Sequence, residues 1–273
     1  MITNHLILLG CFLAHAGMSA AQITFPTSVE LDLVFPRDAT YSPVALMPIV
    51  FAVQNSQAAS SLGLTISWQF VKIGAGDPSS TGFWDLTSTN YSSDPYYIYT
   101  YTPLLKDAEG DFKLLWYAYS TNCSSSGSMD PSFRSENKYV TFTLQNGTQQ
   151  PDLVAAISPD TCATMSTQTY DIVGTVPYSD YENPEPGRNS CAVLAEPSPA
   201  ATPCALSLVS AQASSISAAI TATACAGKYP DLTTGCPQPT KTSSANMVLR
   251  VESSVAVLGL LGILYAGILG LQL

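Results

Sequence analysis

The sequence predicts a mostly β protein, an antiparallel β-sandwich of the immunoglobulin-like type with a disulfide-stapled, β-rich C-terminal extension. Three observations predict this class. Apolar and polar residues alternate with a period of two in several segments of the first half, clusters of Pro, Gly, Asn and Ser separate these segments, and none of comparable length carries a helical stripe. About seven strands in about 125 residues suit one sandwich domain, which we expect over residues 22–150.

The expected strands follow one another between the turn-forming clusters. In most of these strands every second residue is apolar, and the remaining strands are runs of β-branched or aromatic residues. They cover residues 29–35, 46–53, 62–70, 96–102, 112–118 and 140–144. Trp68 suits the buried mid-strand position that immunoglobulin-like sandwiches fill with tryptophan.

The region 151–226 contains most of the cysteines, and the sequence does not decide whether it is separate from the first domain. Residues 170–176 predict a strand, and the Pro- and Glu-rich residues 178–203 predict a long loop stapled by Cys191 and Cys204. Residues 216–224 alternate and predict another strand, with an Ala-rich helix as the alternative. The region is either a second domain or a set of extra strands on the first.

Both ends of the chain are apolar. Residues 1–21 resemble a secretory signal peptide, with a short apolar run and small residues before the expected cut after Ala21. Residues 245–273 resemble the removable signal of a glycolipid anchor, with Ser243 or Ser244 as the attachment site. Residues 227–244 predict a Ser/Thr/Pro-rich stalk. We therefore expect an extracellular protein at the plasma membrane or cell wall.

Six cysteines remain after removal of the signal peptide, and an even number in a secreted chain predicts three disulfides. Their pairing is not fixed by the sequence. The six are Cys123, Cys162, Cys191, Cys204, Cys225 and Cys236. Three Asn-x-Ser/Thr motifs predict N-glycosylation at Asn90, Asn122 and Asn146.

The composition excludes several function classes. His5 and His15 are the only histidines and both lie in the expected signal peptide, which argues against histidine-based catalysis or metal binding in the mature chain. A formal net charge of −10 argues against nucleic acid as a partner. We expect no cofactor, metal or catalytic residue, and the oligomeric state is open.

Carboxylates are the remaining route to catalysis. Glu30 and Asp32 share one strand face, and the ordinary interpretation is a solvent-exposed face opposite Leu31 and Leu33. Two further acidic clusters also have ordinary interpretations. Asp107, Glu109 and Asp111 suit a polar turn between strands. Asp180, Glu182 and Glu185 suit a solvated loop.

Tyrosines are the more informative residues. Tyr97, Tyr99 and Tyr101 would point to one face of their strand, and a row of exposed rings can bind sugars. Ordinary strand packing is the alternative, because tyrosine is common in strands.

The run VELDLVFPR at residues 29–37, with PIVFA at 48–52 and Gln54-Asn55, resembles a family of uncharacterised secreted proteins of filamentous fungi. In that family a domain of unknown function follows a signal peptide, and the resemblance extends over about residues 22–225. It implies a fungal surface protein and supplies no activity.

Two functions are therefore weighed. The first is a lipid-anchored surface glycoprotein with a structural, adhesive or glycan-binding role, and its expected partner is cell-wall polysaccharide. The second is a secreted acid hydrolase of the glycosidase type that uses two carboxylates.

Overall fold

The computed structural model describes residues 23–74, 78–126, 129–178 and 188–226. One sheet contains β1 (Thr27–Phe35), β3 (Met47–Gln54), β6 (Tyr96–Thr102), β10 (Ser166–Pro177) and β11 (Ser190–Ala195). The other contains β2 (Thr40–Tyr41), β4 (Thr65–Lys72), β5 (Pro78–Asp85), β7 (Gly110–Cys123), β8 (Met129–Arg134) and β9 (Lys138–Leu144). The helices are α1 (Ser56–Ala59), α2 (Ser210–Ala226) and the 3-10 turns η1 (Ala155–Ile157), η2 (Cys162–Thr164) and η3 (Pro203–Ala205).

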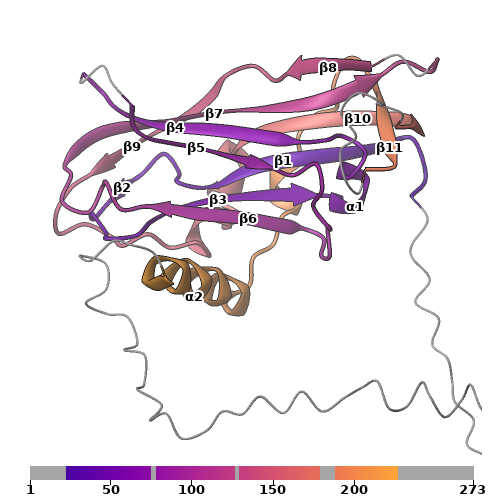
Figure 1. Cartoon of the computed structure of the whole chain (residues 1–273). Coiled ribbons are helices and arrows are strands. Elements are labelled where there is room, and N and C mark those ends of the chain that lie inside the picture. Colours follow the sequence, from indigo (N-terminus) through magenta and orange to yellow (C-terminus); the bar gives the residue numbers. More distant parts are fainter. Residues whose placement is uncertain (1–22, 75–77, 127–128, 179–187, 227–273) are drawn as a thin grey trace, which may run out of the picture. The chain divides into compact units, whose positions relative to one another are not determined.

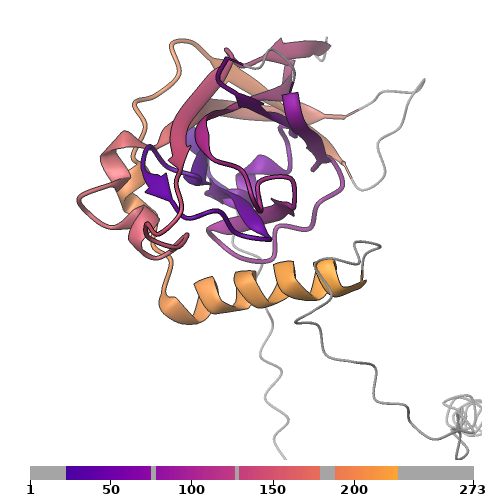
Figure 2. The same ribbon diagram turned by 90° about the vertical axis from the view of Figure 1, so that its left-hand side faces the viewer.

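The two sheets face one another around a common hydrophobic core (Figures 1 and 2). The five-stranded sheet has the order β11-β10-β1-β3-β6, and the six-stranded sheet has the order β2-β9-β7-β4-β5 with β8 beside β7. Neighbouring strands are antiparallel except β2 and β9. The mostly β sandwich is therefore confirmed. Because β10 pairs with β1, the strands after residue 151 extend the first sheet.

Aromatic side chains join the sheets in the core. The fully buried Trp116 of β7 contacts Phe51 of β3, with ring centroids 5.1 Å apart and an interplanar angle of 76°. The indole nitrogen of Trp116 donates a hydrogen bond to Ser166 Oγ at 3.0 Å, which satisfies its polar atom. Trp68 is also buried, as expected for a mid-strand tryptophan.

The five-stranded sheet is covered on both faces. Residues 29–35 of β1 and 47–53 of β3 are buried without alternation, which is the pattern of a strand with protein on either side. The second cover consists of Leu206 and Leu208 in the segment before α2, and of α2 itself, which packs against β6 (Figure 2). This covering explains why polar residues of β1 are buried.

Residues 216–224 are helical, so the strand predicted there is wrong and the Ala-rich alternative is correct. Alanine has the highest helix propensity, and the buried residues of α2 recur at helical spacing. They are Ala213, Ile216, Ile220 and Ala224. The apparent period of two arose because Ala alternates with Ser and Thr on the exposed side. No helix in the described residues is long and apolar enough to cross a membrane.

Two further differences concern strands that the sequence analysis missed. Residues 190–195 form β11 within the segment expected to be a loop. Residues 78–85 form β5 although Gly, Ser and Pro dominate this stretch. Gly82 is needed there because an added Cβ would lie 2.4 Å from the Trp68 ring. Glycine in this strand therefore marks a close approach between the strand and a large side chain.

Disulfide bonds are confirmed, and their pairing is a new result. Cys123 at the end of β7 bonds Cys191 of β11, so this bridge joins the two sheets, with 5.9 Å between the Cα atoms. Cys162 bonds Cys204, which joins η2 to η3 and fixes the segment before α2. Cys191 and Cys204 therefore attach their segment to two different parts of the fold. Cys225 is also disulfide-bonded, and Cys236 lies outside the described residues.

The inter-sheet disulfide makes a first prediction. Replacing Cys123 and Cys191 together by alanine should lower the free energy of unfolding by about 2–5 kcal/mol, because the bridge closes a long loop in the unfolded chain. Denaturant titration by tryptophan fluorescence measures this change. A double variant as stable as the wild type would contradict the structural role of the bridge.

Candidate functional site

The tyrosine row of β6 is largely covered. Tyr97 is half-buried and its hydroxyl donates a hydrogen bond to the Ser207 carbonyl at 2.7 Å, in the segment before α2. Burial raises the pKa of Tyr97 to about 12, and the charge of Asp32 adds to this effect. Tyr101 also packs against the core, whereas 37% of Tyr99 is exposed. The three rings therefore form no continuous exposed row: Tyr97 is bound to the covering segment, Tyr101 packs against the core, and Tyr99 alone of the three is exposed to solvent.

An open groove lies on the outer face of the six-stranded sheet, which none of the described helices covers. Because side chains alternate along a strand, the buried Phe70 and Trp116 leave their neighbours facing outward. The groove has a volume of about 500 Å³. Its lining consists of Ser67, Trp68 and Gln69 of β4, Thr81, Gly82 and Phe83 of β5, Leu115 and Tyr117 of β7, and Asn137. We call it the β4–β7 groove.

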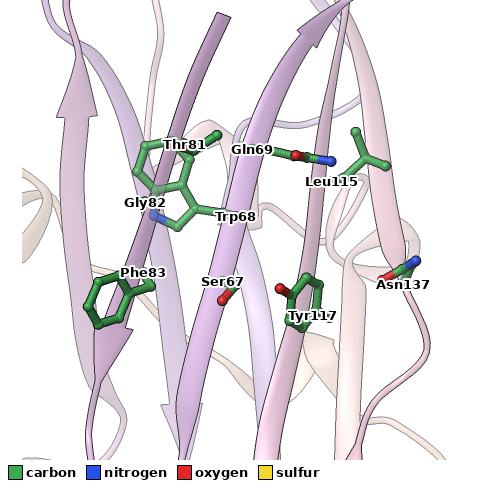
Figure 3. A pocket seen from close by; sticks show the side chains of 9 residues that line it. All are labelled: Ser67, Trp68, Gln69, Thr81, Gly82, Phe83, Leu115, Tyr117 and Asn137. Carbon is green, nitrogen blue, oxygen red and sulfur yellow. The ribbon is translucent and has the colours of Figure 1, made fainter. Parts of the chain in front are cut away.

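Strand register arranges the lining in rows across the sheet. Ser67 pairs with Phe83 on one side and with Tyr117 on the other. Gln69 lies between Thr81 and Leu115 in the next row. Rows of outward-facing residues are about 7 Å apart along a strand. Phe83 and Tyr117 therefore flank β4 with Ser67 between them, and Gln69 lies one row further along the strand (Figure 3).

The aromatic rings at this face are unusually exposed. Phe83 has 71% of its surface exposed and Tyr139 has 60%. Tyr139 pairs with Leu115 and belongs to the same outward row. Tyr117 contacts Tyr119 edge-to-face, with centroids 5.2 Å apart. Large apolar groups gathered around a polar-floored hollow are typical of a binding site, because their exposure to water is unfavourable.

The floor of the groove is rigid. Trp68 lies beneath the strand at Gly82 and contacts Phe70 and Trp84, with ring centroids 6.0 Å apart in each pair. Both β4 and β7 have hydrogen-bonded neighbours on either side. The groove therefore presents a preformed surface, which reduces the entropic cost of binding.

The side chains that line the groove are of kinds that can form hydrogen bonds and ring contacts with a ligand. It offers hydroxyl and amide groups that donate or accept hydrogen bonds, and aromatic faces. The nine lining residues include no carboxylate, histidine or cysteine. The groove therefore lacks the pair of carboxylates that a glycosidase requires.

The acidic pair of β1 lies elsewhere, and the prediction that Glu30 and Asp32 face solvent is wrong. Glu30 is 6% exposed and Asp32 is fully buried, because both faces of their sheet are covered. Gln54 Nε2 donates to Asp32 Oδ2 at 2.8 Å. Glu30 Oε2 accepts hydrogen bonds from the backbone nitrogen and Oγ1 of Thr202, at 2.6 and 3.1 Å.

Burial raises the pKa of Asp32 to about 8. The hydrogen bond from Gln54 and the charge of Arg37 lower it, while the charge of Glu30 raises it further. Glu30 Oε1 and Asp32 Oδ1 are buried and accept no hydrogen bond from the described residues. A proton held by Asp32 can be donated to Glu30 and satisfies both carboxyl groups. The pair is closed beneath the segment containing Thr202, so a substrate does not reach it.

The other acidic groups match their ordinary interpretation where the structure describes them. Asp107 and Glu109 lie in the exposed turn between β6 and β7, and Asp111 is an exposed residue at the start of β7. Glu109 accepts a hydrogen bond from Asn146 Nδ2, and Asp111 accepts one from Thr143 Oγ1 at 2.7 Å. No group of three potential metal ligands forms within the described residues. Asp180, Glu182 and Glu185 lie outside them.

The expected modification sites differ in their surroundings. Asn90 and Asn146 are exposed, whereas Asn122 is half-buried and its Oδ1 accepts a hydrogen bond from Leu194 N at 3.0 Å. The signal peptide, Ser243, Ser244 and residues 245–273 lie outside the described residues.

Sequence reasoning missed the groove residues for a physical reason. Phe83 follows a Ser/Thr/Gly stretch that resembles a turn, and Ser67 and Gln69 are ordinary polar positions of a strand. Only the register of three neighbouring strands brings them together. The one available indication was Phe83 beside Trp84, because adjacent residues in a strand face opposite sides and one of two such rings must face outward.

The buried acid makes a second prediction. A carboxyl with a raised pKa holds its proton in the folded state while the unfolded chain loses it, so stability falls as pH rises from about 4 to about 8. Asp32→Asn removes this proton uptake, keeps an acceptor oxygen for Gln54 and offers an amide donor toward Glu30. The variant should therefore lose this part of the decline and be at least as stable as the wild type at pH 7.

Denaturant titrations from pH 4 to pH 9 provide the measurement. Asp171→Asn is the matched control, because Asp171 lies half-exposed on the adjacent β10, and its profile should follow the wild type. An unchanged slope in Asp32→Asn would show that Asp32 is ionised in the folded protein.

Comparison with known proteins places the whole sandwich in one family. Residues 24–234 match a domain of unknown function, DUF7136. The match includes all described strands and α2. No curated protein matches the sequence.

Proposed function

This chain belongs to the DUF7136 family, defined by a domain of unknown function, and we propose that it is an extracellular glycan-binding glycoprotein. In this proposal a glycolipid anchor holds it at the plasma membrane or cell wall of a filamentous fungus. The binding site is the β4–β7 groove, and the partner is a cell-wall polysaccharide. The observation that carries the proposal is the pair of flanking rings, Phe83 and Tyr117, around a polar floor.

Sugar rings suit this arrangement. A pyranose has apolar C–H faces that pack on aromatic rings, and hydroxyl groups around its rim that exchange hydrogen bonds with amides and hydroxyls. The groove supplies both kinds of contact: Phe83 and Tyr117 offer ring faces, and Ser67, Gln69 and Asn137 offer polar atoms. An open groove on a sheet also accepts the interior of a long polymer, which a closed cavity does not.

The sequence context supports the same function. A chain that is exported and N-glycosylated, as its motifs predict, meets polysaccharide as its most abundant neighbour at a cell wall. The hydrolase alternative has less support, since the acid pair is buried with Glu30 bonded to Thr202, and the lining of the β4–β7 groove has no carboxylate.

A third prediction tests the groove. Phe83→Ala should weaken retention on the bound polysaccharide at least about fivefold, since a ring contact contributes on the order of 1 kcal/mol. The panel comprises chitin, β-glucan, mannan and soluble acidic polysaccharides, measured by pull-down or affinity electrophoresis. Because Phe83 is largely exposed, the free energy of unfolding should change by no more than about 0.5 kcal/mol.

Tyr99→Ala is the matched control, because it removes a partly exposed ring from the five-stranded sheet. It should leave binding unchanged. If Tyr99→Ala weakened binding and Phe83→Ala did not, the site would lie at the tyrosine row of β6. If the wild type bound no member of the panel, glycan binding would be rejected in favour of a structural or adhesive role.

A further inference from the structure

One exposed ring lies beside the β4–β7 groove without lining it. Tyr139 of β9 has 60% of its surface exposed and pairs with Leu115, which lines the groove from β7. Cross-strand partners point to the same face of a sheet, so Tyr139 faces outward with Leu115. Lys113 Nζ lies 4.5 Å from the centroid of the Tyr139 ring, a cation–π contact that limits the motion of this ring. Tyr139 therefore adds a third ring to the face that contains Phe83 and Tyr117.

The strand register gives the spacing of the three rings. Phe83 and Tyr117 pair with Ser67 from opposite sides, so their Cα atoms lie two strand spacings, about 10 Å, apart. Tyr139 lies one strand and one row from Tyr117, because its partner Leu115 is two residues from Tyr117 on β7. This diagonal separation is about 8 Å. Stacked rings have centroids within about 7 Å of each other, so each aromatic ring at this spacing takes its own sugar unit.

The series of rings crosses the strands. It runs from β5 over β4 and β7 to β9, and Figure 3 shows Phe83 and Tyr117 on either side of β4. A second hollow of about 570 Å³ adjoins the groove at Gln69 and Leu115, further along the same strands. Its seven lining residues include no aromatic ring. A sugar chain that stacks on all three rings therefore crosses the strands and presents apolar faces on one side over several consecutive units.

We propose that the ligand of this face is a neutral polysaccharide with a flat, ribbon-like chain, and that successive sugar units stack on Phe83, Tyr117 and Tyr139. The proposal rests on the function proposed above and names its ligand class. A ribbon of glucose or N-acetylglucosamine units, as in cellulose or chitin, has apolar C–H faces on both of its flat sides. The coiled chains of laminarin and amylose turn successive sugar faces in different directions, so they match one ring at a time.

The charges on this face favour a neutral chain. The nine residues that line the groove include no Asp, Glu, Lys or Arg, and their hydroxyl and amide groups suit the hydroxyls of a sugar. Lys113 lies against the Tyr139 ring, and the exposed Asp111 is two residues away from it on β7, so these two charges offset each other. The formal net charge of −10 on the whole chain repels an anionic polymer.

Affinity for oligosaccharides of defined length tests the ligand class. The protein is titrated with cello-, chito-, laminari- and malto-oligosaccharides in an isothermal titration calorimeter. In at least one ribbon series the hexasaccharide should bind about tenfold more tightly than the disaccharide, because one chain then contacts several rings. The same hexasaccharide should bind about tenfold more tightly than laminarihexaose and maltohexaose, which are coiled chains of equal length. The cello and chito series distinguish glucose from N-acetylglucosamine.

Tyr139→Ala should weaken binding of the ribbon hexasaccharide about fivefold and leave the disaccharide within about twofold, because the groove itself holds the short chain. Tyr139→Phe keeps the ring and should keep the affinity for the hexasaccharide. Tyr99→Ala, on the other sheet, is the matched control and should change neither affinity. Circular dichroism and the melting temperature verify that each variant folds. Tyr139→Thr removes the ring with a residue common in strands and replaces the alanine variant if that variant is unstable.

Each contrary outcome rejects a stated part of the argument. Equal affinity for ribbon and coiled hexasaccharides, or binding of acidic polymers alone, rejects the neutral ribbon and leaves glycan binding intact. Equal affinity for a disaccharide and its hexasaccharide rejects stacking on several rings. An unchanged affinity for the hexasaccharide in Tyr139→Ala rejects the third ring. If neither these oligosaccharides nor any polysaccharide binds, the proposed function itself is rejected.

Discussion

The contact between Trp116 and Phe51 fixes which residues of the six-stranded sheet face outward. Because side chains alternate along a strand, holding Trp116 in the core directs Leu115 and Tyr117 to the surface. A register slip of one residue would exchange the two sets and bury the polar floor of the groove. Core packing thus determines which side chains line the β4–β7 groove. The hydrogen bond from Trp116 to Ser166 gives the same ring a fixed orientation across the sheets.

The two sheets differ in what covers them. The five-stranded sheet has the other sheet on one side and the segment before α2 on the other, so its central strands are apolar throughout and its acids are buried. Two disulfides fix its strand β11 and the covering segment. No helix within the described residues covers the outer face of the six-stranded sheet. The five-stranded sheet is therefore buried on both faces, whereas the six-stranded sheet exposes polar and aromatic side chains at the β4–β7 groove.

The sequence was sufficient to predict the strands with strong periodicity, among them β4 and β7, because alternation and burial coincide there. It failed at β5, where Gly82 makes room for Trp68, a tertiary contact that a local pattern does not contain. It failed at α2, because alanine fits either period. Glu30 and Asp32 looked solvent-exposed because the covering segment lies about 170 residues further along the chain. Predicting the groove would have required the register of three neighbouring strands. Disulfides, in contrast, could be predicted from the number of cysteines alone.

The position of α2 has a consequence for how many copies act together. The helix packs against the five-stranded sheet, so its C-terminal end lies on the side of the sandwich opposite the groove (Figure 2). A surface that carried the protein through this end would present every groove outward. Neighbouring copies could then bind successive stretches of one polymer, and the second binding event would occur at high effective concentration. A weak, shallow groove would in this way give a durable attachment through avidity.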